Sequence, residues 1–314
     1  MTIVLDIRSV ERVEDFAAPD DDPDDLGWVK EMWEDGSSRP EWTFVATAAG
    51  ATVGRAGFVV TPSVTNPAWV GLLPPLEMTL FGATAWAGDP VVVLAELVRA
   101  ARRSLGDTVP KILEIRTNPA IHQRPDERLA LAAALDLPLF QEKEGVLWED
   151  RGESVEASRR LRFCSLADIG PHTYAEVFAR IPEGTLDRND RWYYERVRPG
   201  HWAAQMMEYA DGAEETWLIA ASAEGAVGMV AISPFDEPGT ATIAYIGVLP
   251  ENRGNGYVDD LLAAGTDAAQ RAGFTRILSD VDTQNHPMLA AMERAGHHAS
   301  ATPWHVWSHR GEVN

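Results

Sequence analysis

The chain has almost no cysteine, because Cys164 is the single one among 314 residues. One thiol excludes an internal disulfide and any zinc site that needs several cysteines. Long apolar runs are also missing, since no stretch approaches the roughly eighteen apolar residues of a membrane-spanning helix. The opening residues, MTIVLDIRSVERVEDF, lack the basic and apolar regions of a signal peptide. We therefore expect a cytoplasmic protein that binds neither a membrane nor a metal ion.

Positive charge is in short supply: 27 lysines and arginines stand against 48 aspartates and glutamates, a net charge of -21. This excess repels phosphate backbones, which argues against nucleic acid as a partner. It attracts cations, so a cationic small molecule is the partner that we expect. Acidity that serves solubility alone is the alternative. The sequence leaves a monomer and a homodimer both open.

The rest of the composition is that of a folded protein, with 45% hydrophobic and 24% charged residues. At about 150 residues per domain, the length suggests two domains. The polar stretch 149–158 (EDRGESVEAS) is the best linker candidate. It predicts domains at residues 1–150 and 159–314.

The order of predicted elements in the second domain indicates an α+β fold. Apolar periodicity predicts a strand, two helices and a three-stranded meander, followed by helix, strand, helix and strand. These elements are expected at 161–164, 174–180, 192–198, 217–221, 226–233, 240–248, 257–271, 276–280, 287–295 and 303–308. A meander followed by alternating helices and strands predicts a mixed sheet.

The first domain repeats this order, with elements expected at 41–48, 52–60, 76–81, 90–105, 111–116, 128–135 and 145–148. When LVRAARRSLG is aligned with AAGTDAAQRAG, Gly106 matches Gly273, and KILEI then aligns closely with RILSD. Two halves of like pattern indicate duplication of a whole domain.

The segment IAYIGVLPENRGNGYVDDLL carries the clearest chemical signal. A strand ends at Val248, the loop 253–256 (RGNG) follows, and a helix begins at once. Such a loop aims backbone N–H groups at one point, and the helix adds its own N–H groups and its positive dipole end. This geometry binds a pyrophosphate, which glycines allow to approach and Arg253 can hold by a charge-assisted bond. A simple turn is the alternative.

This segment resembles the phosphate loop of the GNAT superfamily of acetyltransferases, which carries R-x-x-G-x-G, or Ala in the last place, after V-x-P. The corresponding residues are Val248, Pro250, Arg253 and Gly256, followed by Val258 where Gly or Ala is usual. The later stretch DVDTQNHPMLAAMERAGH is similar to the family's next motif. It has Asn285 ahead of a helix that ends in Gly296 and His297.

The first half resembles the family in fold only. The residues that stand where the phosphate loop should be are Trp86, Ala87, Gly88 and Asp89. A carboxylate at Asp89 would repel a phosphate there.

The resemblance implies two tandem GNAT-like domains, each a mixed, mostly antiparallel sheet flanked by helices. Residues 1–150 would be a degenerate domain without a phosphate loop, and residues 159–314 the catalytic domain. It implies an N-acetyltransferase with acetyl-CoA as co-substrate, in which a small amine attacks the thioester directly. The residues implied to bind acetyl-CoA are Ile246, Gly247, Val248, Arg253, Gly254, Asn255, Gly256, Tyr257, Asn285 and Met288.

In the family, the strand before the loop bulges and splays from its neighbour. Its free backbone groups then pair with the pantetheine arm as an added strand would. Gly247 fits such a bulge, with a close packing contact as the alternative. The N–H of Val248 would face the thioester carbonyl and stabilise the oxyanion.

Amine acylation needs a base for the amine, and the leaving thiolate sometimes needs an acid. The family often supplies that acid with a Tyr, whose position here is Met292. A thiolate, with a pKa of about 8.5, can leave without one. Our candidates are Asp282 as base and Tyr245 as proton relay, with helix capping and core packing as their respective alternatives.

Three residues are candidates for binding the acceptor. Glu183 and Asp187 in PEGTLDR could hold a cation, and Tyr193 could contact it through its ring. Ordinary turn roles and core packing are the alternatives. Two rival functions stay open: an enzyme that uses another acyl-CoA or a hydroxyl acceptor, and a catalytically silent acyl-CoA-binding protein, which Met292 favours.

Overall fold

The computed structural model describes residues 4–17, 26–59, 76–83, 89–106, 111–117, 125–152, 155, 158–196, 206–207, 210, 212–235, 237–299 and 303–310. The chain divides into two compact units. Unit 1 combines Met1–Phe140 with His305–Asn314, and unit 2 is the continuous stretch Gln141–Trp304.

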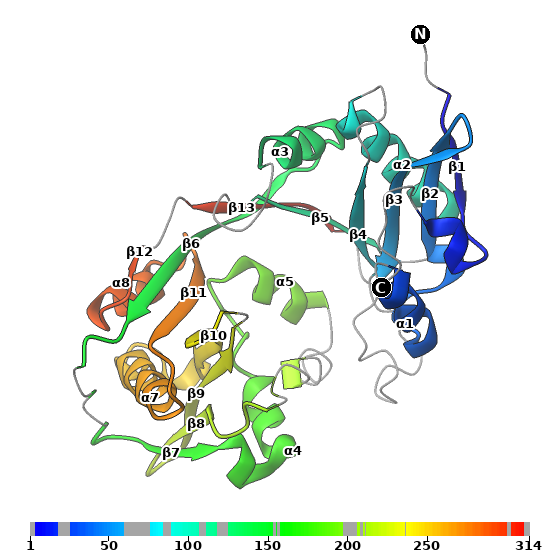
Figure 1. Ribbon diagram of the computed structural model, residues 1–314. Helices are drawn as coiled ribbons and strands as arrows, with labels where there is room; N and C mark the ends of the chain where they lie inside the picture. Colours follow the sequence, from blue (N-terminus) through cyan, green and yellow to red (C-terminus); the bar gives the residue numbers. More distant parts are fainter. Residues whose placement is uncertain are drawn as a thin grey trace. The chain divides into compact units, whose positions relative to one another are not determined.

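Unit 1 contains a sheet with the strand order β1–β2–β3–β4–β5–β13 (Figure 1). The strands β4 and β5 pair in parallel, and the other neighbours are antiparallel. Its elements are β1 (Asp6–Ser9), α1 (Gly27–Asp35), β2 (Thr43–Ala48), β3 (Ala51–Val59), β4 (Leu76–Ala83), α2 (Pro90–Leu105), β5 (Lys111–Thr117), α3 (Pro125–Ala134) and β13 (Trp304–Arg310), with short 3-10 turns at Val13–Phe16 and Pro40–Trp42.

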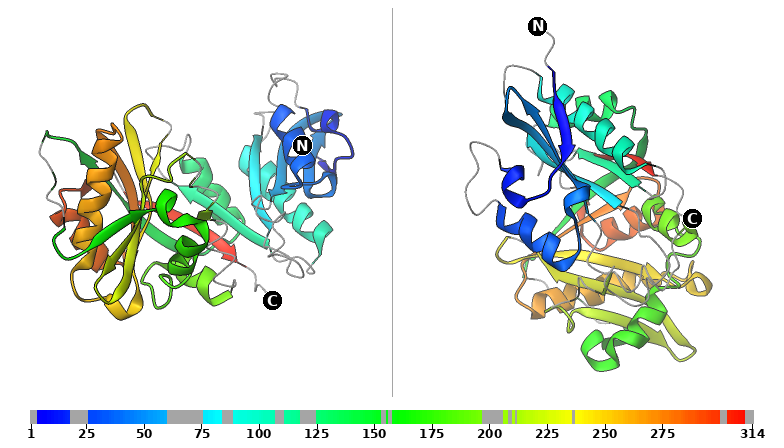
Figure 2. Two further views of the ribbon diagram at one scale, coloured as in Figure 1. Left: turned by 90° about the horizontal axis from the view of Figure 1, so that it is seen from below. Right: turned by 90° about the vertical axis from the view of Figure 1, so that its right-hand side faces the viewer.

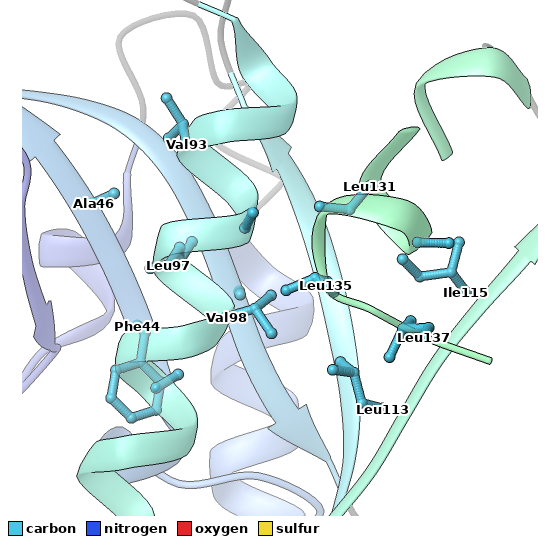
Figure 3. Packing of buried hydrophobic residues seen from close by; sticks show 14 of the residues in the cluster. Phe44, Ala46, Val93, Leu97, Val98, Leu113, Ile115, Leu131, Leu135 and Leu137 are labelled. Carbon is cyan, nitrogen blue, oxygen red and sulfur yellow. The ribbon is translucent and has the colours of Figure 1, made fainter. Parts of the chain in front are cut away.

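The core of unit 1 lies between this sheet and the helices α2 and α3. The apolar residues of α2 recur at helical spacing, so Val93, Leu97 and Val98 share one face. Figure 3 shows them packed beside Phe44 of β2 and Leu131 of α3, and all five are buried. Each such side chain stabilises the fold by about 1.5–3 kcal/mol when fully buried.

Unit 2 contains a sheet with the order β6–β11–β10–β9–β8–β7, and β12 also pairs with β6. Here β10 and β11 are parallel, and the other neighbours are antiparallel. Its elements are β6 (Leu139–Glu149), β7 (Arg162–Ser165), α4 (Leu166–Phe178), α5 (Arg188–Arg196), β8 (Trp217–Ser222), β9 (Gly225–Pro234), β10 (Thr240–Val248), a 3-10 turn (Pro250–Asn252), α7 (Tyr257–Arg271), β11 (Arg276–Asp282), α8 (His286–Arg294) and β12 (His298–Ala299).

The helices α7 and α4 cover opposite faces of this sheet (Figure 2). On one face, α7 approaches β9 so closely that a Cβ on Gly265 would lie 2.8 Å from Val230. On the other face, Tyr174 of α4 packs against Trp217 of β8, with ring centroids 5.7 Å apart. Successive side chains of each strand point to opposite faces of the sheet, because the backbone is pleated.

The predicted α+β class with mixed sheets is confirmed, and α2, β10 and α7 have the predicted bounds. The strands at the unit boundaries differ from the expectation. Residues 143–149 of β6 pair with β11 in unit 2, and β13 pairs with β5 in unit 1. The predicted division at 150 and 159 had assigned each strand to the other unit, because it followed the chain order.

Among the described helices, none has the length and apolar character needed to cross a lipid bilayer.

Candidate functional site

The strand β10 is irregular near its middle and open along its second half. Ile243 and Tyr245 face successive residues of β9, so Ala244 is an extra residue that forms a β-bulge. The parallel pairing with β11 extends from Thr240 to Thr242. Beyond Thr242 the two strands splay, which leaves an edge that an extended ligand can pair with.

Gly247 allows close packing and does not form the bulge of β10. The bulge lies at Ala244, whereas a Cβ on Gly247 would lie 2.2 Å from Cγ2 of Ile181. The structure therefore supports the alternative, in which Gly247 allows a close packing contact.

The backbone of Val248 points toward the open edge. The N–H of Leu249 donates to the carbonyl of Val227 in β9, 2.8 Å away. Because successive backbone groups of a strand alternate in direction, the N–H of Val248 points away from β9. That is the side on which a carbonyl oxygen of a bound ligand could accept it.

The loop after β10 leads into the uncapped start of α7. Gly254 and Gly256 have φ of 81° and 71°, in the left-handed region that glycine tolerates best. Gly256 occupies the N-cap position of α7 and has no side chain that could cap the helix. The first N–H groups of α7 are thus available to an anion.

Arg253 ties this loop to the segment between α4 and α5. Its guanidinium donates to the carbonyls of Val248 (3.1 Å), Glu183 (2.7 Å) and Ile181 (2.6 Å). These bonds use three of its five N–H donors, so Arg253 combines a structural role with remaining capacity for a phosphate.

One pocket of about 570 Å³ extends along unit 2 from this loop to a group of acidic side chains. The predicted site residues that line it are Tyr245, Ile246, Gly247, Val248, Arg253, Gly254, Gly256, Tyr257, Asp187, Asp282, Asn285 and Met288. Asn255 does not belong to the lining, because its amide donates back to the carbonyls of Asn252 and Arg253. Met292, at the family's usual Tyr position, lines the pocket and is buried.

The acidic end of the pocket contains Asp190, which sequence reasoning missed. The hydroxyl of Tyr245 donates to Oδ2 of Asp190 across 2.7 Å. Burial, and then the charge of Asp187, raise the pKa of Asp190 to about 7, against the opposing effects of Tyr245 and Lys143. A carboxylate with that pKa is suited to accept a proton at neutral pH.

Lys143, also missed, lies on β6 and forms an ion pair with Asp280. Its ammonium lies 5.3 Å from the centroid of the Trp304 ring. Burial alone would lower the pKa of Lys143, but the charges of Asp280 and Asp187 raise it above its ordinary value. Lys143 therefore keeps its charge and offsets part of the negative charge of the pocket.

Gln141 holds two of the predicted acidic residues in place. Its amide nitrogen donates to Asp187 (3.1 Å) and to Asp282 (3.0 Å). Asp282 is 1% exposed and also accepts from the backbone N–H groups of Arg188 and Gln284. These donors occupy both carboxylate oxygens, which disfavours Asp282 as a base. The capping alternative does not hold for α8, because the N-cap of that helix is Asn285 and no side chain caps it.

The other two predicted acceptor residues lie outside the pocket lining. Tyr193 is buried and packs edge-on against Trp192, with ring centroids 5.1 Å apart. The side chain of Glu183 is exposed and hydrogen-bonds with Tyr194. Asp187 does line the pocket, where it also caps α5 by accepting from the N–H of Asp190.

The matching position of unit 1 is occupied by a carboxylate. Asp89 caps α2 by accepting from the N–H of Val91 across 2.9 Å, and Pro90 has no N–H to offer. The start of α2 is therefore satisfied by its own side chain where α7 leaves its groups open. Trp86, Ala87 and Gly88 lie outside the described residues.

Comparisons with known proteins agree with this geometry. Residues 183–297 match the model of the acetyltransferase (GNAT) family. A search of curated proteins gave no match.

Solved structures similar to the chain along its length include a GCN5-related N-acetyltransferase from Sphaerobacter thermophilus, at 17% identity and a TM-score of 0.58, covering 98% of this chain and 95% of that chain. A tandem GNAT protein from the clavulanic acid biosynthesis pathway matches at 17% identity and a TM-score of 0.56, covering 98% of both chains. A GNAT-family acetyltransferase from Colwellia psychrerythraea matches at 12% identity and a TM-score of 0.51, covering 97% of this chain and 99% of that chain. Residues 183–297 are thus a domain of the acetyltransferase (GNAT) family, within a chain that has the tandem GNAT fold.

Proposed function

We propose that the protein is an acetyl-CoA-dependent N-acyltransferase that acts on a small cationic amine. The observation that carries this proposal is the pocket of unit 2 described above. It joins the open edge of β10 and the uncapped start of α7 to the carboxylates of Asp187, Asp190 and Asp280. One end suits an anionic cofactor, and the other suits a cationic acceptor.

The cofactor end supports a defined orientation for acetyl-CoA. The backbone of 254–257 would hold the pyrophosphate, and the free edge of β10 would pair with the pantetheine arm. The N–H of Val248 would then donate to the thioester carbonyl and stabilise its negative charge as the amine attacks.

The acidic end supports direct transfer. The carboxylates hold the ammonium form of the acceptor, and Asp190 takes its proton so that a neutral amine attacks. A C–N bond forms to the acyl carbon, the C–S bond breaks, and CoA leaves as a thiolate, while the second proton of the amine nitrogen is released to solvent as the amide forms. Met292 has no proton to donate, which a thiolate leaving group with a pKa of about 8.5 tolerates.

A second candidate is a catalytically silent acyl-CoA-binding protein. Met292, a thioether that lines the pocket at the family's usual acid position, favours it. An enzyme that uses another acyl-CoA or a hydroxyl acceptor is a rival of the same class.

The test combines acetyl-CoA binding by calorimetry with release of free CoA in the presence of amines and matched alcohols. We expect binding, and turnover that is fastest with cationic amines. Gly256→Asp is the binding control, because it places a carboxylate where the pyrophosphate approaches. Binding without turnover on any acceptor would establish the silent protein instead, and turnover confined to alcohols would establish a hydroxyl acceptor.

A further inference from the structure

Arg160 contacts the phosphate loop from outside the pocket. It lies two residues before β7, and it is not a lining residue of the pocket. Its guanidinium donates to the carbonyl oxygens of Asn255 (3.1 Å) and Gly256 (3.3 Å). The same group lies 5.0 Å from the centroid of the Tyr257 ring.

These two contacts determine where two N–H groups point. A trans peptide is planar, and its C=O and N–H point in opposite directions. The carbonyl of Asn255 shares a plane with the N–H of Gly256, and the carbonyl of Gly256 shares one with the N–H of Tyr257. Holding both oxygens on the Arg160 side turns both N–H groups to the other side, and Gly256 and Tyr257 line the pocket.

Arg160 also neutralises a carboxylate at the start of α7. Asp259 and Asp260 both lie in the first turn of the helix, where they would repel a bound anion. Asp260 forms an ion pair with Arg160, and Asp259 is paired with Arg294 at 2.8 Å. The pairing leaves the field of the N–H groups and the helix dipole to act on the ligand.

We propose that Arg160 is a positioning residue for the pyrophosphate of acyl-CoA, which it serves without touching the ligand. It orients the N–H groups of Gly256 and Tyr257 and cancels the charge of Asp260. This inference rests on the proposed function, because the anion is the pyrophosphate of that cofactor.

The experiment compares two ligands that differ in the pyrophosphate. Acetyl-CoA carries it, and S-acetylpantetheine lacks it together with the adenosine. We expect Arg160→Gln to weaken acetyl-CoA binding about tenfold, equivalent to about 1.4 kcal/mol. The affinity for S-acetylpantetheine should stay unchanged. In turnover assays, KM for acetyl-CoA rises and kcat at saturation is retained, because the reacting end is untouched.

Two further variants separate the effects of Arg160. Arg160→Lys keeps the charge beside Asp260 but loses the fork that spans two carbonyls, so we expect an intermediate affinity. Arg160→Gln with Asp260→Asn removes the uncompensated carboxylate, so we expect tighter binding than with Arg160→Gln alone. Arg162→Gln, an exposed change of the same charge in β7, is the matched control and should leave both affinities as in the unmodified protein.

Two results would overturn the inference. One is an unchanged acetyl-CoA affinity in Arg160→Gln, and the other is an equal loss for both ligands, which would mean general damage to the fold. If the unmodified protein does not bind acetyl-CoA, the proposed function fails, and that result is distinct from either of these. Should Arg160→Gln unfold, Arg160→Lys gives the same comparison.

Discussion

The hydroxyl of Tyr245, the residue directly after the β10 bulge, donates a hydrogen bond to the carboxylate of Asp190. The extra residue Ala244 shifts the register of the strand, so the same bulge that opens the edge of β10 brings the phenol to the acidic end of the pocket. Burial and the charge of Asp190 raise the pKa of Tyr245 well above its ordinary value, so the phenol stays a donor. Asp190 is the partner that titrates near neutral pH.

Replacing Asp190 should remove the base. We expect Asp190→Asn to lower kcat roughly 100-fold or more, with acetyl-CoA affinity retained, because Asp190 belongs to α5 and not to the loop 253–256. In the unmodified enzyme, kcat/KM for the acceptor should rise with pH through about 7, since Asp190 acts in its deprotonated form. An unchanged pH profile in Asp190→Asn would assign the base elsewhere.

Two neighbours of Asp190 should shift that pH dependence in opposite directions. The charge of Lys143 lowers the pKa of Asp190, so Lys143→Met should move the rise in kcat/KM to higher pH. The charge of Asp187 raises it, so Asp187→Asn should move the rise to lower pH. Asparagine keeps an oxygen for the N–H of Asp190, so the cap of α5 survives. Shifts in the same direction would contradict this electrostatic account.

Asp187→Asn should also weaken the binding of the acceptor. Loss of one carboxylate from the pocket is expected to raise KM for a cationic amine, and the effect should shrink as ionic strength screens the remaining charges. A neutral acceptor of the same size is the control. Salt-insensitive kinetics, with Asp187→Asn equal to the unmodified enzyme, would mean that the acidity serves solubility alone.

Acetyl-CoA should bind with a stoichiometry of one per chain. In unit 2 the start of α7 is uncapped, whereas in unit 1 Asp89 already caps α2 with a negative charge. Calorimetric titration measures this number directly. Two equivalent sites would show that the first domain keeps a function that Asp89 argues against.

Met292→Tyr should leave turnover unchanged or raise it. The side chain lines the pocket at the position where the family usually has a Tyr, so a phenol there would offer a proton to the leaving thiolate. Steady-state turnover together with acetyl-CoA affinity makes the test. A folded variant that binds acetyl-CoA but has lost turnover would give Met292 a role in shaping the site.

His297 should make stability depend on pH. It follows α8, is 2% exposed, and its two ring nitrogens are without a hydrogen-bond partner among the described residues. Burial lowers the pKa of His297 from 6.5 to about 4. The unfolded chain therefore binds a proton as pH falls below 6.5 and the folded protein does not until about 4, so stability is lost across this window.

The loss attributable to His297 should total about 3 kcal/mol at the lower end of the window. His297→Phe removes the titrating group and keeps an aromatic ring, so its unfolding free energy should fall less between pH 6.5 and 4 than that of the unmodified protein. Urea unfolding at several pH values measures both. Parallel curves for the two proteins would exclude His297 as the cause.

Local signals were sufficient to predict much of the fold and one end of the site. The bounds of α7 and α2 followed from the glycine and proline at their ends, and the loop 253–256 from its glycines and the helix after it. The acidic end depends on long-range contacts, such as the one that joins Gln141 to Asp282. Lys143 and Gln141 also lie before the predicted boundary at 150, so exchange of the boundary strands hid their place in unit 2.

That exchange affects the order in which the protein can fold during synthesis. Domains generally fold from the N-terminus onward as they leave the ribosome. Here β5 of unit 1 pairs with residues 305–310 of β13, which are translated after every residue of unit 2. Unit 2 is encoded without interruption, so we expect the half that was translated second to reach its complete fold first. The edge of β5 in unit 1 then stays unpaired until β13 has been synthesised.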